Sequence, residues 1–284
     1  MSTKFIVSPM LEKISLKPGE TYKGQIIVAN PKDATEDFYY KLDISPYSVI
    51  GEDYTPDFET ESDWSRIVYW TSLEKTEGVL KPNETEKIGY TIEVPKSAPA
   101  GGQYLKIGVT SNAPSNARDG GAVQNVFEMA SLVFAKIDGE TRREGEIVDS
   151  ELPGFVAVGK PTAKVRLSNT GNVHETATTK ITVKNIFNGD VVSPKDGENN
   201  ILESIIMPES TREITQALNL PPVGIFEITE EVSFMGETVT PTGVLIICPI
   251  WFILLVLGFI LSIVGMVFYK KRLHSKRTSA KIEP

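Results

Sequence analysis

The sequence of 284 residues predicts an all-β protein: two immunoglobulin-like or fibronectin-like β-sandwiches in tandem, followed by one C-terminal transmembrane α-helix. Three observations carry this prediction. Hydrophobic residues alternate with polar ones through much of residues 1–243, turn residues separate the alternating runs, and an uncharged apolar segment of 26 residues follows. No 3.6-residue pattern precedes that segment, which argues against a helical body.

The alternation has the period of two that a half-buried strand requires, because successive side chains of a strand point to opposite faces. The apolar members of the clearest runs are Phe38, Tyr40, Leu42, Ile44, Ile88, Tyr90, Ile92, Val94, Leu105, Ile107, Val109, Ala163, Val165, Leu167, Ile181 and Val183. The run VFEMASLVFAK at 126–136 is apolar on both faces, which indicates a central or a long final strand.

Turn sequences fall between these runs. Lys17-Pro-Gly-Glu20 and Lys81-Pro-Asn-Glu84 look alike and predict the same turn before a strand, and Asn188-Gly189 predicts a β-hairpin. Strands at this spacing, without helices between them, are typical of β-sandwiches. The polar stretch 138–145 is the best boundary, so we expect one sandwich in residues 1–139 and a second in residues 140–243.

The uncharged segment 244–269 is long enough to span a membrane: as a helix it reaches about 39 Å, against roughly 30 Å for the hydrocarbon core. Trp251 and Tyr269 lie near its two ends, where such rings prefer the membrane interface. The basic tail 270–284 follows, and it begins with Lys270, Lys271 and Arg272. Basic clusters stay in the cytoplasm, so we expect a single-pass protein of the cell membrane with residues 1–243 extracellular and the C-terminus cytoplasmic.

Export of residues 1–243 requires a signal peptide. The first nine residues hold three consecutive apolar residues, fewer than a signal-peptide core contains, so we expect that a signal peptide was removed before Met1. The alternative is a tail-anchored protein with a cytosolic body, whose basic tail would have to cross the membrane.

The composition excludes several classes of function. The net charge is −8, but the tail 270–284 carries +5, so residues 1–269 carry −13, which argues against nucleic acid as a partner. One cysteine and two histidines leave no disulfide framework and almost no possibility of a His/Cys zinc site. Because G-x-S-x-G, Walker and dinucleotide glycine patterns are absent, we expect neither enzymatic activity nor a cofactor. His174 is expected to end a loop between strands and to bond the backbone.

Aromatic residues concentrate in 38–70, which holds nine of the chain's 24. Two of them belong to the core face of the first alternating run. Tyr39, Tyr54, Trp64 and Trp70 remain as exposed candidates for ligand contact, because the flat face of a tyrosine or tryptophan ring can stack on a sugar. The alternative is that these rings also fill the core.

The same segment carries six carboxylates within twelve residues: Glu52, Asp53, Asp57, Glu59, Glu61 and Asp63. A calcium ion takes six to eight oxygen ligands, but the spacing matches no EF-hand loop. A solvated acidic loop is the better interpretation, so we expect no metal site, with calcium at 52–63 as the open alternative.

Several segments resemble the WxL-interacting proteins of Gram-positive cell surfaces. They are FIVSP at 5–9, LKPGETYKGQIIVAN at 16–30, YTIEVPKSAPAGGQYLKIGV at 90–109 and the C-terminal layout of helix and basic tail. The resemblance implies a peptidoglycan-binding immunoglobulin-like domain, a second sandwich and a membrane anchor. The segments RLSNTGNVHETATTKITVKNIFNG at 166–189 and IMPESTREI at 206–214 look like the immunoglobulin-like stalk modules of bacterial surface proteins.

We therefore expect a bacterial, non-enzymatic adhesion or scaffold protein. Its distal sandwich would contact a cell-wall glycan or a surface protein, and its helix would contact the lipid bilayer. The alternative is an auxiliary subunit of a membrane transport or secretion complex.

Overall fold

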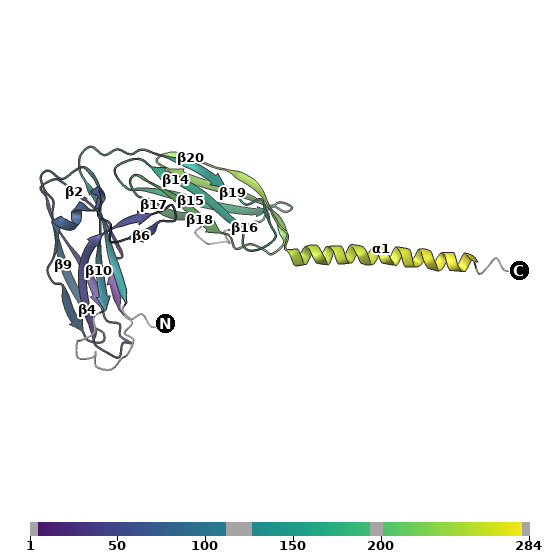
Figure 1. Ribbon diagram of the computed structural model, residues 1–284, viewed down its shortest axis with the longest axis horizontal. Helices are drawn as coiled ribbons and strands as arrows, with labels where there is room; N and C mark the ends of the chain where they lie inside the picture. The colour runs from purple at the N-terminus through teal and green to yellow at the C-terminus, as the bar shows by residue number, and fades with distance from the viewer. Residues whose placement is uncertain (1–4, 112–126, 194–200, 280–284) are drawn as a thin grey trace. The chain divides into compact units, whose positions relative to one another are not determined.

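A computed structural model describes residues 5–111, 127–193 and 201–279, with side chains described up to Lys270. The chain divides into two compact units, both built mainly of β-strands (Figure 1). Unit 1 comprises Met1–Glu146, Leu167–Thr176 and Ile205–Glu213, and unit 2 comprises Ile147–Arg166, Ala177–Ser204 and Ile214–Pro284. Each unit draws on separated stretches of the chain, so the boundary after residue 139 and the tandem arrangement stay predictions.

Unit 1 contains a four-stranded sheet of order β1-β3-β9-β7 and a five-stranded sheet of order β2-β11-β10-β4-β8. Their bounds are β1 (Ile6–Ser8), β2 (Leu11–Leu16), β3 (Thr21–Ala29), β4 (Phe38–Pro46), β7 (Thr71–Leu73), β8 (Glu77–Leu80), β9 (Thr85–Glu93), β10 (Gly101–Ser111) and β11 (Glu128–Ile137). Neighbouring strands are antiparallel except β2 and β11, which are parallel. The predicted strand at 126–136 is confirmed from Glu128 on as β11, inside the five-stranded sheet, while residue 126 lies outside the described residues.

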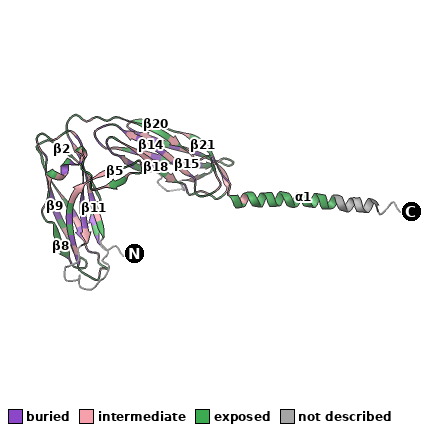
Figure 2. Ribbon diagram, in the orientation of Figure 1, coloured by how far each residue is buried: buried purple, intermediate pink, exposed green. Residues whose placement is uncertain are grey.

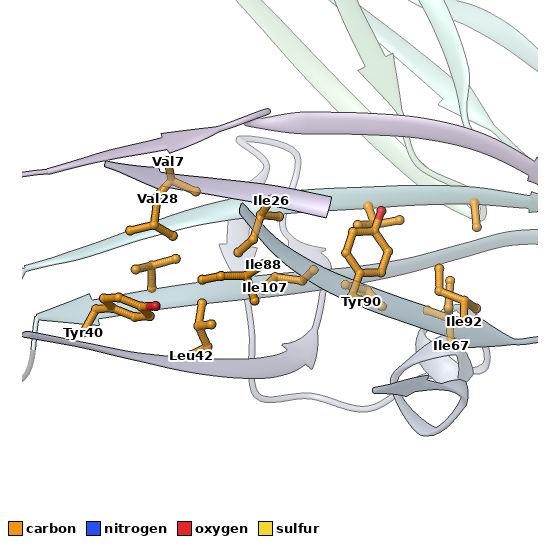
Figure 3. Close-up of a cluster of buried hydrophobic side chains, with 14 of the residues drawn as sticks. Val7, Ile26, Val28, Tyr40, Leu42, Ile67, Ile88, Tyr90, Ile92 and Ile107 are labelled. Carbon is orange, nitrogen blue, oxygen red and sulfur yellow. The ribbon is translucent and has the colours of Figure 1, made fainter. Parts of the chain in front are cut away.

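The two sheets enclose one hydrophobic core, to which each strand contributes alternate residues (Figure 3). In β9, for example, Ile88, Tyr90 and Ile92 are buried. The predicted core faces at 38–44, 88–94 and 105–109 are therefore confirmed. Fully burying a side chain of this size stabilises a fold by about 1.5–3 kcal/mol, so the alternating pattern is the main source of cohesion.

The two Lys-Pro-Gly/Asn-Glu turns have the same hydrogen bonds, as predicted. In each, the glutamate N–H donates to the lysine carbonyl at 3.0 Å, and the glutamate carboxylate accepts from the lysine N–H at 2.7 Å. The third residue has a positive φ, 83° at Gly19 and 68° at Asn83, which glycine and asparagine tolerate best.

Strand β10 is buried on both faces. Leu105 and Ile107 point into the core, so Tyr104 and Lys106 point to the opposite face of the five-stranded sheet. Segment 47–70 packs against that face: the Lys106 ammonium, for example, lies 4.5 Å from the centre of the Phe58 ring. The same ammonium forms an ion pair with Glu128 at 2.5 Å, which offsets the cost of burying the charge.

Segment 47–70 is structured as β5 (Ser48–Ile50), β6 (Thr55–Asp57) and the 3₁₀ helix η1 (Asp63–Trp70). The prediction of no helix before residue 244 is therefore wrong at η1. Its start is capped reciprocally, because the Ser62 hydroxyl accepts from the Trp64 N–H at 3.3 Å while the Ser65 hydroxyl accepts from the Ser62 N–H at 2.8 Å. The buried Gln103 of β10 holds η1, since its amide donates to the Asp63 carbonyl at 2.8 Å and accepts from the Ile67 N–H at 3.1 Å.

Two further sheets have the strand orders β12-β14-β18 and β13-β21-β19-β15-β16. In the second of these sheets, β17 also pairs with β15, and β20 pairs with β19. Their bounds are β12 (Gly145–Glu151), β13 (Phe155–Val156), β14 (Thr162–Asn169), β15 (Glu175–Asn185), β16 (Val191–Ser193), β17 (Ile201–Ile206), β18 (Ser210–Ala217), β19 (Gly224–Phe234), β20 (Glu237–Val239) and β21 (Thr242–Ile247). The core of unit 2 includes Ala163, Ile181 and Val183, as the alternation predicts. The predicted hairpin at Asn188-Gly189 is present, with a φ of 74° at Gly189, but residues 186–190 connect β15 to β16, so the expected two-residue connection is wrong.

The uncharged run 244–269 divides between a strand and a helix, which corrects the predicted helix start. Leu245 and Ile247 are buried in unit 2 as part of β21, because the run begins with strand-like alternation. Helix α1 (Ile250–Ser279) follows. Within its stretch Ile250–Lys270, the most apolar 18 residues have a mean hydropathy of 2.8. The side chains of this stretch are exposed almost throughout (Figure 2).

Candidate functional site

The four rings predicted to be exposed, Tyr39, Tyr54, Trp64 and Trp70, are all half-buried. Tyr39 lies in β4 opposite Val79 of β8, and Trp70 packs against the core of unit 1. Tyr54 and Trp64 instead meet in a second cluster on the opposite face of the five-stranded sheet. The expectation that the four rings are exposed is therefore wrong, since Tyr54 and Trp64 cover the sheet and Trp70 packs against the core. A role of the four rings in ligand contact stays a prediction.

We call this second cluster the outer aromatic cluster. Its buried members are Tyr104, Phe134 and Met207, and its partly buried members are Tyr47, Val49, Tyr54, Trp64, Leu132 and Ile205. Tyr104 and Phe134 are directly paired across β10 and β11, with ring centres 5.0 Å apart in an edge-to-face arrangement. All these residues belong to unit 1.

Tyr54 connects β6 to the segment 205–213 of unit 1. Its hydroxyl accepts from the Met207 N–H at 2.9 Å and also bonds the Ser210 hydroxyl. The Arg212 guanidinium lies 4.6 Å from the ring centre, a cation–π distance. With its hydroxyl and one ring face occupied, Tyr54 acts as a structural tie in this geometry.

His174 lies between β14 and β15 and packs edge-on against the Tyr104 and Phe134 rings. The backbone N–H of His174 donates to the Tyr104 hydroxyl at 2.9 Å, and the imidazole Nδ1 lies 3.1 Å from the same oxygen. The direction of the second bond depends on the imidazole tautomer: the hydroxyl donates its proton to Nδ1 when that nitrogen is unprotonated. The side-chain partner is thus a hydroxyl, where the sequence predicted a backbone group.

The surroundings of His174 favour the neutral state of its imidazole. Burial lowers the pKa of His174 from 6.5 to about 4, with the positive charges of Lys13 and Lys136 acting in the same direction and Glu175 opposing them. Arg143 makes a two-bonded ion pair with Glu175, at 2.5 Å and 2.7 Å, so the only nearby carboxylate among the described pocket residues is already engaged.

These side chains line a hollow of about 280 Å³, which we call the basic pocket. Its lining residues are Lys13, Ile14, Ser15, Phe134, Lys136, Arg143, Val173, His174 and Glu175, all from unit 1. Lys13 and Lys136 come from the parallel strands β2 and β11, where Lys13 pairs with Phe134 and Lys136 with Ser15. Within the described part of the chain, neither lysine forms an ion pair, so the pocket carries an excess of positive charge.

A second hollow of unit 1, of about 380 Å³, is lined by Trp64 together with Arg66, Gln103 and Glu209. Among the four predicted rings, Trp64 therefore has a place beside a space that a ligand could enter. Two carboxylates, of Asp63 and Glu209, face one guanidinium there, whereas positive charges outnumber negative ones in the basic pocket.

Several acidic residues of 52–63 accept hydrogen bonds from residues close in sequence. The Asp53 carboxylate accepts from the Thr55 hydroxyl at 2.9 Å, and Asp57 accepts from the Glu59 and Thr60 N–H groups at 2.9 Å and 3.2 Å. A hydrogen bond with the Thr60 side chain lowers the pKa of Asp57 most, and the bond from the Glu59 N–H acts in the same direction. Within the described residues, no group of three or more potential ligands is placed to hold a metal ion.

Sequence reasoning missed the basic pocket, because its lysines are ordinary polar members of alternating strands. One signal was visible: the run 126–136 is apolar on both faces, which requires a second packed layer beyond the main core. Phe134 belongs to that layer, and His174 lies against it.

No family model and no curated protein matches the chain. Among solved structures, it is similar to the chain in "Chaperone-tip adhesin complex is vital for synergistic activation of CFA/I fimbriae biogenesis", at 13% identity and a TM-score of 0.42, covering 85% of this chain and 99% of that one. It is also similar to the class 5 fimbriae chaperone CfaA, at 14% identity and a TM-score of 0.40, with 84% and 98% covered. A third is the CsuC–CsuE chaperone–tip subunit complex of Acinetobacter baumannii, at 11% identity and a TM-score of 0.41, with 87% and 100% covered.

These neighbours correct the resemblance to the WxL-interacting proteins, because they are fimbrial chaperones. The segments that suggested that family consist of turn and strand signals, such as the Lys-Pro-Gly-Glu turn and the alternation of β3 and β9. Any mostly-β protein of this immunoglobulin-like type needs such signals, so they indicate a fold and not a family. At these identities and TM-scores, the new likeness says nothing of activity or partner.

Acidification is predicted to destabilise unit 1 through His174. The unfolded imidazole takes a proton near pH 6.5 and the folded one only near pH 4, so between these values the unfolded state binds more protons. The free energy of unfolding should fall by roughly 3 kcal/mol from pH 7 to pH 4, and His174→Asn should remove this part of the pH dependence. Urea denaturation of the full chain in detergent micelles measures it, with His274→Asn in the basic tail as the control. Identical pH profiles for the wild type and His174→Asn would contradict the assignment.

Trp70 is predicted to be structural. Trp70→Ala should lower the free energy of unfolding by about 2–4 kcal/mol, because the ring packs against the core of unit 1. The neighbouring Tyr69 is 70% exposed, so Tyr69→Ala should change it by no more than about 0.5 kcal/mol. Thermal melts of both variants, followed by circular dichroism, make the comparison. Equal stability of the two variants would show that Trp70 does not contribute to the core.

Proposed function

We propose that the chain is a membrane-anchored, non-enzymatic binding protein that holds an acidic group of a protein partner in the basic pocket. The observation that carries the proposal is the placement of Lys13 and Lys136 in one hollow, diagonally across β2 and β11, where the carboxylate of Glu175 is already paired with Arg143. An excess of positive charge in a body that is acidic overall attracts a negative group to one place.

The lining of the basic pocket suits a carboxylate. Lysine ammonium groups can supply charge-assisted hydrogen bonds, which are about twice as strong as neutral ones. The lowered pKa keeps His174 neutral at pH 7, and the ring forms part of the wall while its Nδ1 lies 3.1 Å from the Tyr104 hydroxyl. Strand β2 lies at the edge of the five-stranded sheet, so a partner chain could also pair with its backbone.

The anchoring part of the proposal rests on α1. The stretch Ile250–Lys270 is long and apolar enough to cross a membrane, and the basic residues Lys270, Lys271 and Arg272 follow at once. Such a cluster favours a cytoplasmic C-terminus, which would leave both compact units outside. Trp251 and Tyr269 are exposed near the two ends of the stretch, as interface anchors require.

A protein partner is favoured over the expected cell-wall glycan. Sugar stacking needs a free ring face, and the four predicted rings are half-buried, three of them in the hydrophobic clusters of unit 1. The alternative of an auxiliary subunit of a membrane complex is one form of the same proposal, since it also requires a protein partner.

The lysine pair is predicted to control partner binding. Lys13→Glu combined with Lys136→Glu should weaken retention of the partner at least about tenfold, equivalent to 1.4 kcal/mol, because the pocket changes sign. The full chain is immobilised in lipid nanodiscs and exposed to detergent-extracted envelope proteins of the source cells, and retained proteins are quantified by mass spectrometry. Lys23→Glu combined with Lys41→Glu, two exposed lysines of β3 and β4 in unit 1, serves as the control. Unchanged retention by the pocket variant, or retention of purified peptidoglycan in place of any protein, would overturn the proposal.

The orientation is predicted to leave the body accessible from outside. Protease added to intact cells that produce the chain should remove the two units and leave a short membrane-bound stub, detected by an antibody against the basic tail. Complete protection of the body on cells whose other surface proteins are digested would favour the tail-anchored alternative.

A further inference from the structure

Strand register brings several loops of unit 2 to one end of the seven-stranded sheet. Ile247, at the end of β21, pairs with Gly224 at the start of β19 and with Val156 at the end of β13. Asn185, at the end of β15, pairs with Phe226 beside them. The loops that leave these strand ends therefore lie together, at what we call the helix-proximal end.

The helix-proximal end exposes apolar side chains at the tips of its loops. Phe187 is 80% exposed at the tip of the β15–β16 hairpin, beside Ile186 at 49%, and Val158 is 77% exposed in the loop after β13. The β19–β20 hairpin, at the opposite end of β19, turns at Met235, which is half-buried, and Gly236, and the exposed Glu237 begins β20. Large apolar side chains at loop tips face water at a cost of free energy unless another surface covers them.

The covalent structure brings this end close to α1. Only Cys248 and Pro249 separate β21 from α1, and two residues reach about 7 Å when fully extended. The Cys248 N–H also donates to the Val156 carbonyl at 3.0 Å, which holds the start of this connection to β13. Wherever the first turn of α1 enters a membrane, the helix-proximal end must lie at its surface.

A hollow of about 940 Å³ lies at the same end of unit 2. Apolar side chains such as Leu218, Leu220 and Trp251 line it, together with Lys160, whose ammonium donates to Asn219 at 2.8 Å. A lining of apolar side chains and one lysine suits the boundary between acyl chains and lipid headgroups, where long basic side chains extend toward the headgroups.

We infer that the helix-proximal end of unit 2 docks on the lipid bilayer, with Phe187 and Val158 inserted into the outer interface beside the first turn of α1. This inference rests on the proposed anchoring and adds a second, peripheral membrane contact to it. The asymmetry of unit 2 carries it: exposed apolar tips gather at the end that is covalently tied to the apolar helix.

The test places an environment-sensitive fluorophore on the full chain in liposomes of phosphatidylcholine and phosphatidylglycerol. In a Cys248→Ser background, Phe187→Cys or Val158→Cys carries the label, and Glu237→Cys at the opposite hairpin is the control. The labels at 187 and 158 should emit at shorter wavelength than the control, and spin-labelled lipid of the outer leaflet should quench them at least about threefold more. Both positions are highly exposed, so the substitutions leave the core intact, and circular dichroism of each variant verifies it.

Protease digestion of the same liposomes separates the inference from the proposed function. If the helix segment is protected but the labels at 187 and 158 behave like the control, the docking inference is overturned while the anchoring holds. If the helix segment is not protected, the anchoring itself has failed. A third outcome would also overturn the inference. The labels would emit at shorter wavelength than the control, but the spin-labelled lipid would not quench them, and the wavelength shift would grow with the protein-to-lipid ratio. This result would show contact between copies of the chain.

Discussion

Strand β10 is packed on both sides, and much of unit 1 is arranged to satisfy that requirement. Leu105 and Ile107 point into the hydrophobic core, so Tyr104 and Lys106 must be covered on the opposite face. An uncovered tyrosine ring would lose its apolar contacts, and a buried ammonium without a partner would cost several kcal/mol. Segment 47–70 supplies the cover, and Glu128 supplies the opposite charge. The aromatic richness of the segment follows from this task.

The same layer determines the electrostatics of the basic pocket. The Tyr104 hydroxyl accepts from the backbone N–H of His174 and also lies within hydrogen-bond distance of the imidazole Nδ1. Burial in this layer keeps the imidazole neutral, and the lysines of β2 and β11 reinforce that state. The positive charge of the pocket therefore resides on the lysines and on Arg143, which Glu175 neutralises. This geometry supports a binding role for the two lysines and a structural role for His174.

The two proposals use different parts of the chain. The partner site lies in unit 1 and depends on charge, whereas the membrane contact lies in unit 2 and depends on exposed apolar tips such as Phe187. Their dependence on salt should differ accordingly, since ion pairs are screened and apolar contacts are not. A protein with both properties would present its binding pocket from a body held at the membrane surface by more than its helix.

The sequence alone determined the features that depend on short-range chemistry. The period of two identified the core faces of β4, β9 and β10, and proline followed by glycine or asparagine identified two turns with the same bonds, because side-chain direction and permitted φ are local properties. Tertiary structure decided the rest. Nothing in Tyr54 or Trp64 shows that they cover a sheet, nothing in Lys13 shows that it lies beside Lys136, and the apolar run 244–269 does not show where its strand ends and its helix begins. Each of these depends on which distant strand becomes a neighbour, and that choice is made by the pairing and packing of the whole chain.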